Sequence, residues 1–597
     1  MPKNPDRFRS VKTPNIVFIL TDDQGYGDLG CHGNNVIQTP HIDRFYNDAV
    51  RFNNYHVGST CAPTRAGILT GHYCNSAGVW HTIGGRSLLR ADEWTLADAL
   101  SSAGYQTGHF GKWHLGDSQP FRPHERGFHE TIYHAGGGIG NTGDPWGNDY
   151  FDDTYFHNGT PKQFKGYCTD VFFREGMRFI EKNANRPFFC YIATNAPHGP
   201  LNIEPHYVDI YRDSTPHEDR ARFYGMITNI DENFGLVETC LEDLGIMDNT
   251  IVIFMTDNGT ASGVELDGDE FPIEGLGSFN AGMRGIKGSQ YEGGHRVPFL
   301  IRYPDGKITD GRDVDILASY VDVMPTLLDL CGIPVPKKQH FHGHSLAPLL
   351  RGKPPTTELT DRFNVCDTQR TAHPVKWRQS SVMKCNWRLI DGYELYDVAK
   401  DPGQRQDVSS NYPEVTSELR ADYEHWWDMV SEQFDRDQPI ALGQNDESVK
   451  LTTHDIRNAD CSAVWNHRQV RFGQITNGYW AIEVKTAGQY EIELRRWPEE
   501  TSYALTAGID GDDSDWRRDC IQEKHAPAYE NGVALNLKSA HINIGGHNLY
   551  RDIDMDAEAV IFSVELAAGK DQLCASFQDY SKHNIAPYYV YVRRRPL

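Results

Sequence analysis

Short apolar runs alternate with amphipathic patterns over the first 330 residues of the chain. The clearest apolar runs lie at residues 15–20, 105–110, 187–194 and 250–255. Between and after them, apolar positions recur at helical spacing, for example at residues 39–50, 95–105 and 321–334. Short strands that alternate with amphipathic helices are typical of a parallel sheet covered by helices. This part of the chain is therefore predicted to be α/β.

Start and stop residues mark three of these helices. Thr39 and Thr95 stand where N-caps are expected, because Thr side chains accept hydrogen bonds from the first free backbone N–H groups. Gly104 and Gly332 stand where helices are expected to stop, because glycine adopts the left-handed conformation of many C-caps. These signals predict helices with defined ends.

A further helix is predicted over residues 61–71, with the sequence CAPTRAGILTG. Pro63 has a fixed φ that suits a first helical turn, and Gly71 is placed to end the helix. This interpretation accounts for the helix but gives Cys61 no role.

The pattern changes after residue 355. Residues 356–440 contain short strands followed by a polar helix at about 412–430, which predicts a smaller α+β subdomain. Residues 450–597 alternate apolar and polar positions between turn glycines, which predicts an accessory β-sandwich domain. The α/β domain is then expected to span residues 14–355.

Composition and charge exclude several classes of partner. The 597 residues carry a formal charge of −24, from 82 acidic and 58 basic residues. No broad basic face is available for nucleic acid or for an anionic membrane surface. No apolar run approaches the 18 residues of a membrane span. We therefore expect no nucleic-acid partner and no membrane span.

The N-terminus and the cysteines bear on the compartment. Residues 1–15 are charged and lack the apolar stretch of a secretory signal. The protein is expected to be cytoplasmic if the sequence is complete, and periplasmic or secreted if a leader has been removed. The twelve cysteines follow neither zinc-ligand spacing nor a disulfide framework, so most are expected to be buried thiols.

Polar clusters follow four of the predicted strands directly. They contain Asp22 and Asp23, Lys112 and His114, Asn195 and His198, and Asp257 and Asn258. In open α/β sheets, ligands bind at the carboxyl ends of the strands. Each cluster alone could be a helix cap, a turn or a surface group, but together they predict one polar crevice.

The chemistry of these side chains suggests two adjoining subsites. Carboxylate and amide oxygens form a set that suits a hard cation, Ca²⁺ or Mg²⁺, better than zinc. The residues of this set are Asp22, Asp23, Asp257 and Asn258. Beside them, a cationic pocket for an anion is predicted from Arg65, Lys112, His114 and His198.

Three other segments carry weaker signals. The glycine-rich stretch at 285–299 contains Lys287 and Arg296, which could be site cations or loop cations. Residues 138–143 match a dinucleotide fingerprint in letters, but no strand precedes them, so a loop at the substrate rim is predicted. Residues 510–515 are acidic but lack the glycine and final glutamate of an EF-hand.

The sequence resembles the formylglycine-dependent sulfatase family in several ordered motifs. Cys61, Pro63 and Arg65, followed by Leu69-Thr70-Gly71, look like the signature in which the cysteine is converted to Cα-formylglycine. The motifs TDDQGYGD, GKWHLG, NAPHGP, TDNG and KGSQYEGG agree in identity and order. The resemblance covers roughly residues 14–430 and implies an alkaline phosphatase-like mixed sheet flanked by helices.

The resemblance implies a role for each matching residue. One Ca²⁺ would be bound by Asp22, Asp23, Asp257 and Asn258, with the modified Cys61 completing its shell. Arg65 would hold the formylglycine. The sulfate would be surrounded by Lys112, His114, His198 and Lys287. A formylglycine-generating maturation enzyme is an implied partner.

The implied reaction is hydrolysis of a sulfate monoester. One hydroxyl of a hydrated aldehyde can attack sulfur, and the other can expel sulfate by C–O cleavage. His198 is the expected general acid and His114 the expected base. The expected substrate is a sulfated carbohydrate or an aryl sulfate.

Two alternatives remain at this point. A phosphatase or phosphonate monoester hydrolase of the same superfamily would need further ligands if it used two metal ions. A catalytically silent glycan-binding homologue would need a broken catalytic set. In the C-terminal region, Trp465, Trp480 and Trp497 could face a sugar, although core positions are the simpler interpretation.

Overall fold

A ten-stranded mixed sheet forms the centre of the computed structural model, which describes residues 13–215, 217–273, 275, 278–511, 519–521 and 531–595. The strand order is β11-β2-β10-β9-β1-β8-β4-β5-β6-β7. Its parallel centre consists of β9 (Thr250–Thr256), β1 (Asn15–Thr21), β8 (Phe188–Ala193), β4 (Gln106–Lys112) and β5 (Glu130–His134). All four apolar runs predicted as strands therefore pair as neighbours.

The flanking strands make the sheet mixed. On one side, β10 (Phe299–Arg302) runs antiparallel to β9 and also pairs with β2 (Val50–Phe52), which is followed by β11 (Asp313–Val314). On the other side, β6 (Thr154–His157) and β7 (Thr160–Gln163) extend the sheet antiparallel from β5.

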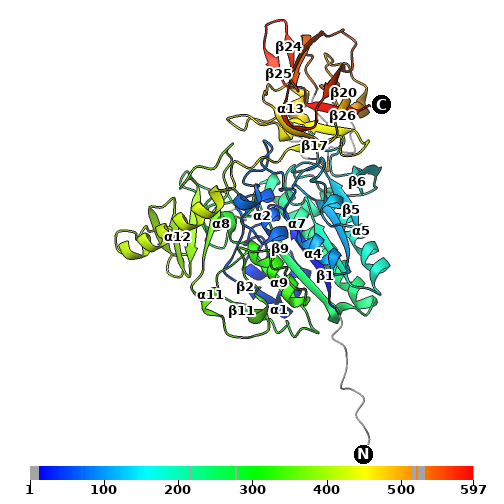
Figure 1. Ribbon diagram of the computed structural model, residues 1–597. Coiled ribbons are helices and arrows are strands. Elements are labelled where there is room, and N and C mark those ends of the chain that lie inside the picture. Colours follow the sequence, from blue (N-terminus) through cyan, green and yellow to red (C-terminus); the bar gives the residue numbers. More distant parts are fainter. Residues whose placement is uncertain are drawn as a thin grey trace, which may run out of the picture.

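Helices cover both faces of this sheet, as Figure 1 shows. One core contains Phe18 and Leu20 of β1, and the other contains Val17 and Ile19, because successive side chains of a strand point to opposite faces. The first core packs against α2 (Cys61–Thr70), α4 (Leu96–Ser102) and α9 (Val323–Leu330). The second packs against α1 (Pro40–Asp48), α5 (Cys168–Asn183) and α7 (Glu218–Asp243).

The two predicted threonine caps differ in what their hydroxyls do. Thr95 forms a capping box, because its Oγ1 accepts from the Asp98 N–H and the Asp98 carboxylate accepts from the Thr95 N–H, both at 3.0 Å. Thr39 occupies the N-cap position of α1, but its hydroxyl donates to Asp43 Oδ1 at 3.0 Å. Such a cap stabilises a helix by about 1 kcal/mol, so only α4 gains it from the threonine hydroxyl.

The smaller subdomain consists of an antiparallel sheet and one long helix. Its strands are β13 (Phe363–Asp367), β14 (Ser380–Lys384), β15 (Trp387–Ile390) and β16 (Glu394–Asp397). The polar helix predicted at 412–430 is α12 (Pro413–Ser431), which packs on this sheet through Leu419, Tyr423 and Trp426.

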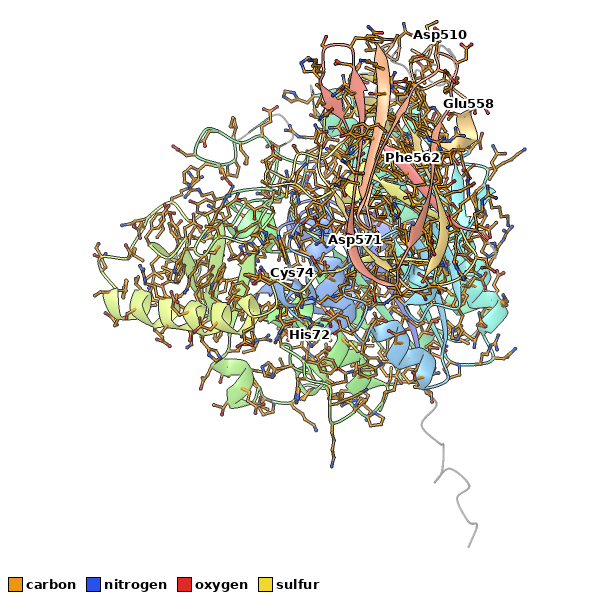
Figure 2. All side chains as sticks on the ribbon, turned by 45° about the horizontal axis from the view of Figure 1, so that its top comes forward. His72, Cys74, Asp510, Glu558, Phe562 and Asp571 are labelled. Carbon is orange, nitrogen blue, oxygen red and sulfur yellow. The ribbon has the colours of Figure 1, made fainter. Side chains whose placement is uncertain are left out.

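Two further antiparallel-rich sheets form the C-terminal region, which lies at one end of the α/β unit in Figure 1. One contains β17 (Ile440–Leu442), β19 (Trp480–Val484), β24 (Gly569–Asp579), β21 (Leu537–Ile544), β22 (His547–Asp552) and β25 (Asn584–Ile585). The other contains β18 (Val449–Thr452), β26 (Tyr589–Arg594), β20 (Gly488–Arg495) and β23 (Val560–Leu566). Buried side chains of both sheets, such as Phe562 of β23 labelled in Figure 2, form a third core. The predicted β-sandwich is therefore confirmed as architecture.

The third core also receives residues from the α/β unit. Leu88 and Phe121 are buried in it, and Trp146 packs against it. Trp146 lies edge-on to the ring of Trp497, with 5.3 Å between ring centroids. The C-terminal sheets are therefore packed directly against loops of the α/β unit.

Two negative expectations can be checked on the described residues. None of the helices in that part of the chain is both long and apolar enough to span a membrane. All twelve cysteines lie among the described residues, and all are free thiols. Residues 512–515 of the acidic segment 510–515 lie outside the described residues.

Candidate active site

The carboxyl ends of the parallel strands bring the predicted polar clusters together. β9, β1, β8 and β4 are consecutive neighbours, so the residues that follow them meet at one edge of the sheet. Backbone hydrogen bonds join these strand ends, because the Asp22 N–H donates to Ala196 O at 3.2 Å and the Asp257 N–H donates to Thr21 O at 3.1 Å. The expected crevice is therefore built by the sheet itself.

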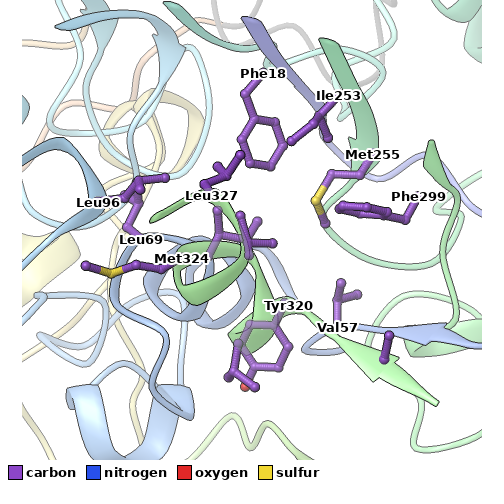
Figure 3. Close-up of a cluster of buried hydrophobic side chains, with 14 of the residues drawn as sticks. Phe18, Val57, Leu69, Leu96, Ile253, Met255, Phe299, Tyr320, Met324 and Leu327 are labelled. Carbon is purple, nitrogen blue, oxygen red and sulfur yellow. The ribbon is translucent and has the colours of Figure 1, made fainter. Parts of the chain in front are cut away.

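Cys61 is the first residue of α2, and Thr60 is its N-cap residue. Every residue of α2 is buried, and Gly71 ends the helix with a φ of 70°. Gly67 lets α2 approach its neighbour closely, because a Cβ there would lie 2.1 Å from the ring of Tyr320. Close packing thus holds the N-terminus of α2 at the sheet edge, where its free N–H groups and dipole favour an anion. Figure 3 shows Leu69 and Tyr320 in the core beneath this helix.

Three buried carboxylates lie beside Cys61. Ligand atoms of Asp22, Asp23 and Asp257 lie within 4.8 Å of one another, and so do those of Asp22, Cys61 and His198. The Cys61 Sγ lies 4.0 Å from Asp23 Oδ1. These carboxylates and the Cys61 side chain therefore share one small volume.

Two lysines lie against the carboxylates. Lys112 Nζ donates to Asp22 Oδ2 at 2.5 Å, and Lys287 Nζ donates to Asp23 Oδ2 at 2.7 Å. Burial alone would raise the pKa of Asp23, but Lys287 and other nearby cations hold it below its ordinary value. Burial would lower the pKa of Lys287, and Asp23 raises it above its ordinary value. Lys287 therefore stays cationic.

Arg65 lies one helical turn after Cys61, on the same side of α2. Its Nε and one terminal nitrogen donate to Asp257 Oδ2 at 3.0 and 2.8 Å, and the other terminal nitrogen donates to the Lys112 carbonyl at 2.9 Å. The guanidinium thus ties α2 to the ends of β9 and β4.

The oxygen set has unused acceptors. Asp22 Oδ1 and Asn258 Oδ1 are buried and have no hydrogen-bond partner within the described parts of the chain. Burial and the charge of Asp257 raise the pKa of Asp22 well above its ordinary value. A bound divalent cation would relieve this repulsion and use the unpaired oxygens, so the residues fit a hard cation such as Ca²⁺.

A second buried group of possible ligands has a different character. His56, Glu292 and His295 lie close together, but Arg388 Nε already donates to Glu292 Oε1 at 2.6 Å. The two histidine rings contact each other through Nδ1 atoms at 2.9 Å. A guanidinium in the centre makes this group an ion-paired network rather than a cation site.

The two predicted histidines present one nitrogen each to the site. His198 Nδ1 lies 2.7 Å from the Gly199 carbonyl and must carry the proton there, which leaves Nε2 at 3.7 Å from Asp23 Oδ2. His114 Nε2 lies 2.8 Å from the Thr82 carbonyl and carries the proton there, so Nδ1 of the neutral ring has a lone pair. This Nδ1 has no hydrogen-bond partner among the described residues. Burial, with Lys287, lowers the pKa of His198 to about 3, and burial lowers the pKa of His114 well below its ordinary value.

A pocket of about 270 Å³ opens over Cys61. Among the predicted residues, Cys61, His114, His198 and Lys287 line it. A second pocket of about 360 Å³ shares Lys287 with the first. Burial, with the charge of Asp22, raises the pKa of the Cys61 thiol to about 12. The unmodified thiol in this environment is therefore protonated at neutral pH.

Sequence reasoning missed much of the pocket wall. The additional lining residues are His81, Thr82, Ile83, Gly137, Asn141, Arg370, His454 and Trp465. The rim loop predicted at 138–143 supplies Asn141. Of the three tryptophans, Trp480 and Trp497 are fully buried core residues, whereas Trp465 is half-buried and lines the pocket. Arg296 lies outside the pocket lining and stacks over Tyr26 at 4.8 Å.

The chain matches two family profiles. Residues 14–333 match the family described as "Sulfatase", and residues 287–427 match "N-sulphoglucosamine sulphohydrolase, C-terminal". Neither match extends beyond residue 427.

Similar proteins and structures agree with these matches. Human arylsulfatase A is 29% identical, with 69% of this chain and 87% of that protein covered. Human N-acetylgalactosamine-6-sulfatase is 31% identical, with 68% of this chain and 84% of that protein covered. A crystal structure described as Ps i-CgsB in complex with k-i-k-neocarrahexaose has a TM-score of 0.63 and 26% identity, and covers 71% of this chain and 94% of that chain.

Proposed function

Since the chain belongs to the sulfatase family and is a sulfuric ester hydrolase, we propose that it removes sulfate from a sulfated carbohydrate. One observation carries this proposal: Cys61 lies at the N-terminus of a buried helix, beside the buried Lys112 and the half-buried Lys287. One Asp22 carboxylate oxygen and the Asn258 amide oxygen there have no hydrogen-bond partner among the described residues. Similar proteins named for sulfated sugars support the substrate class. Two adjoining pockets that share Lys287 and Arg370 leave room for a substrate larger than the sulfate group.

We propose that Cys61 is converted to formylglycine by a maturation enzyme before the protein acts. The hydrated aldehyde would supply one hydroxyl to attack sulfur, with cleavage of the ester S–O bond and release of the sugar alcohol, and a second hydroxyl whose deprotonation would expel sulfate by C–O cleavage and restore the aldehyde. Asp22, Asp23, Asp257 and Asn258 would hold one Ca²⁺, which supplies positive charge to polarise the sulfate oxygens. Their unpaired oxygens and the raised pKa of Asp22 support this assignment.

The cationic side chains have separate tasks in this proposal. Lys287 and Lys112 stabilise charge on the sulfate oxygens, because carboxylates fix both ammonium groups beside Cys61. Arg65 positions the nucleophile by holding α2 against Asp257. The N-terminus of α2 adds backbone N–H groups directed toward an anion.

The two histidines move protons. His198 donates to the leaving oxygen from Nε2, and the negative charge of the bound sulfate favours the protonated ring that this requires. His114 accepts a proton at Nδ1, because the Thr82 carbonyl fixes the hydrogen on Nε2.

Replacing His198 with Ala should harm sugar sulfates more than activated aryl sulfates. A sugar alcohol is a poor leaving group and needs a proton, whereas 4-nitrophenolate leaves readily without one. We expect kcat for a sulfated sugar to fall about 10²-fold, with a much smaller loss for 4-nitrophenyl sulfate. Equal losses for the two leaving groups would contradict the general-acid role.

A phosphatase or phosphonate hydrolase is the alternative reaction. In this site, Lys112 and Lys287 occupy one side of Asp22 and Asp23, where a second metal ion would need free carboxylate oxygens. We therefore expect phenyl sulfate to be hydrolysed with a kcat/KM well above that for phenyl phosphate and phenyl phosphonate, measured in parallel. A preference for the phosphorus esters would reverse the proposal. No turnover of any ester by correctly modified protein would favour a silent glycan-binding homologue.

A further inference from the structure

The segment at residues 453–467 lies between two loops of the α/β unit. It follows β18 and belongs to the C-terminal region, beyond both family matches. On one side, the Gly84 N–H donates to the His454 carbonyl at 2.8 Å. On the other side, the Thr142 N–H donates to the Trp465 carbonyl at 3.0 Å. The backbone of this segment is therefore fixed at the rim of the pocket over Cys61.

Glycines allow this close approach. A Cβ on Gly85 would lie 2.9 Å from the Asp455 carbonyl, and Gly85 has a φ of 64° that suits glycine. A Cβ on Gly84 would meet the Cys461 sulfur at 3.4 Å. The loop that contains Gly84 and Gly85 therefore packs closely against the 453–467 segment.

His454 is a buried side chain in the pocket wall with one nitrogen unused. It is 2% exposed, and its Nδ1 lies 3.2 Å from Asp455 Oδ1. Its Nε2 has no hydrogen-bond partner anywhere in the described residues. The ring lies 5.9 Å from that of His114, between centroids. Because an unpaired buried polar nitrogen is costly, a ligand that pairs with it would be favoured.

The electrostatic setting of His454 differs from that of the other pocket histidines. Burial would lower its pKa, but the hydrogen bond and charge of Asp455 raise it above the ordinary value. Burial lowers the pKa of His81 to about 3, and His114 and His198 are also shifted downward. His454 is therefore held by Asp455 at Nδ1, and its Nε2 is left for a hydrogen bond with a ligand.

Trp465 adds a second recognition element from the same segment. It is half-buried and is one of the residues that line the pocket. Aromatic rings in binding pockets offer a flat apolar surface, and a few fixed polar groups then orient the ligand. A pyranose ring has both features, with C–H groups on its faces and hydroxyls at its edge.

We propose that His454 and Trp465 recognise the sugar that carries the sulfate, with Trp465 packing on the ring and His454 forming a hydrogen bond through Nε2 with a hydroxyl near the ester. This inference rests on the proposed sulfated-carbohydrate function. It makes the C-terminal region part of the active site, because that region supplies two residues of the substrate pocket. Both residues are specificity-determining and neither takes part in the transfer of sulfate.

The test compares substrates with and without a sugar in full-length, formylglycine-modified protein. The variants are His454→Phe, which keeps a ring but removes both nitrogens, Trp465→Ala, and Trp465→Phe as the conservative replacement. The substrates are a panel of sulfated mono- and disaccharides and 4-methylumbelliferyl sulfate. We expect the ratio of kcat/KM for the sugar to that for the aryl sulfate to fall about tenfold in His454→Phe and Trp465→Ala, mainly through KM. Trp465→Phe should recover most of the loss.

A matched control is His547→Gln on the outer strand β22, which should leave the ratio unchanged. An unchanged ratio in His454→Phe and Trp465→Ala, or equal losses for sugar and aryl substrates, would overturn the inference while the proposed function stands. If the unaltered protein hydrolyses the aryl sulfate but none of the sugars, the carbohydrate proposal and this inference both fail. The activity of the unaltered protein on the substrate panel thus tests the proposed carbohydrate function. The kcat/KM ratios of the variants test the roles of His454 and Trp465.

Discussion

Cys61→Ala is expected to lower turnover of an aryl sulfate at least about 10⁴-fold, because the alanine provides no atom that can become the nucleophile. The fold should persist, since the 4.0 Å approach to Asp23 is the shortest polar contact of the Cys61 thiol among the described residues, and alanine is a good helix former. The measurement is kcat on purified protein with a thermal unfolding curve beside it.

Cys74→Ala is the matched control for this replacement. Cys74 is also a buried free cysteine at the start of a short helix, α3 (Cys74–Ala77), and it does not line the pocket. Figure 2 labels its position on the α/β unit. We expect this variant to retain near-normal kcat. Substantial turnover by Cys61→Ala would refute any nucleophilic role for residue 61.

The second large effect is expected at Asp257. Asp257→Asn keeps the shape of the side chain but removes a charge that pairs with Arg65 and that the proposed cation would also use. Loss of a polarising cation removes several kcal/mol of transition-state stabilisation, so kcat should fall about 10³-fold or more. Removing Ca²⁺ from the unaltered protein with a chelator should give a similar loss, restored by added Ca²⁺.

Thermal unfolding measures Ca²⁺ binding at the same site without depending on turnover. A ligand that binds the folded state raises the melting temperature, so Ca²⁺ should stabilise the unaltered protein and should have little effect on Asp257→Asn. Asp231→Asn serves as the control, because Asp231 is equally buried but accepts from the first N–H groups of α1 instead. That variant should be less stable yet keep its response to Ca²⁺. An Asp257→Asn protein with a normal Ca²⁺ response would contradict the assigned ligand set.

The convergence of the catalytic residues could be predicted because it follows from local rules. Buried-strand runs identify the strands, and the parallel arrangement places the residues after them at one edge of the sheet. Asp22, Lys112, His198 and Asp257 all follow this rule. The N-terminal position of Cys61 in its helix followed from Pro63 and Gly71. The domain boundaries at 355, 440 and 450 remain predictions.

The individual contacts within the site were harder to predict from the sequence. The sequence predicted that Lys112 would contact sulfate, and the structure pairs its Nζ with Asp22. Arg65 was expected to hold the modified residue, and its described hydrogen bonds go to Asp257 and Lys112. Distances of this kind depend on side-chain rotamers and close packing, which motif spacing does not encode.

The part of the pocket wall that comes from the C-terminal region could not be predicted from local rules. His454 and Trp465 lie nearly 400 residues after Cys61 and outside any recognised motif. Their position depends on how the C-terminal sheets pack on Leu88, Phe121 and Trp146, which is a tertiary event. The one available signal was an aromatic residue in a β-rich region, and it did not distinguish Trp465 from the core residues Trp480 and Trp497.

We propose that formylglycine made from Cys61 is the catalytic residue of this sulfate ester hydrolase. A thiol near a helix N-terminus could itself be a nucleophile if its pKa were lowered, so the chemical state of residue 61 must be measured directly. Preparations made with and without a maturation enzyme give different modified fractions. Tryptic mass spectrometry of the Cys61 peptide, read beside kcat on the same samples, relates the two. We predict that turnover rises in proportion to the formylglycine fraction and is absent from wholly unmodified protein, whereas robust turnover by protein that contains only the thiol would contradict the claim.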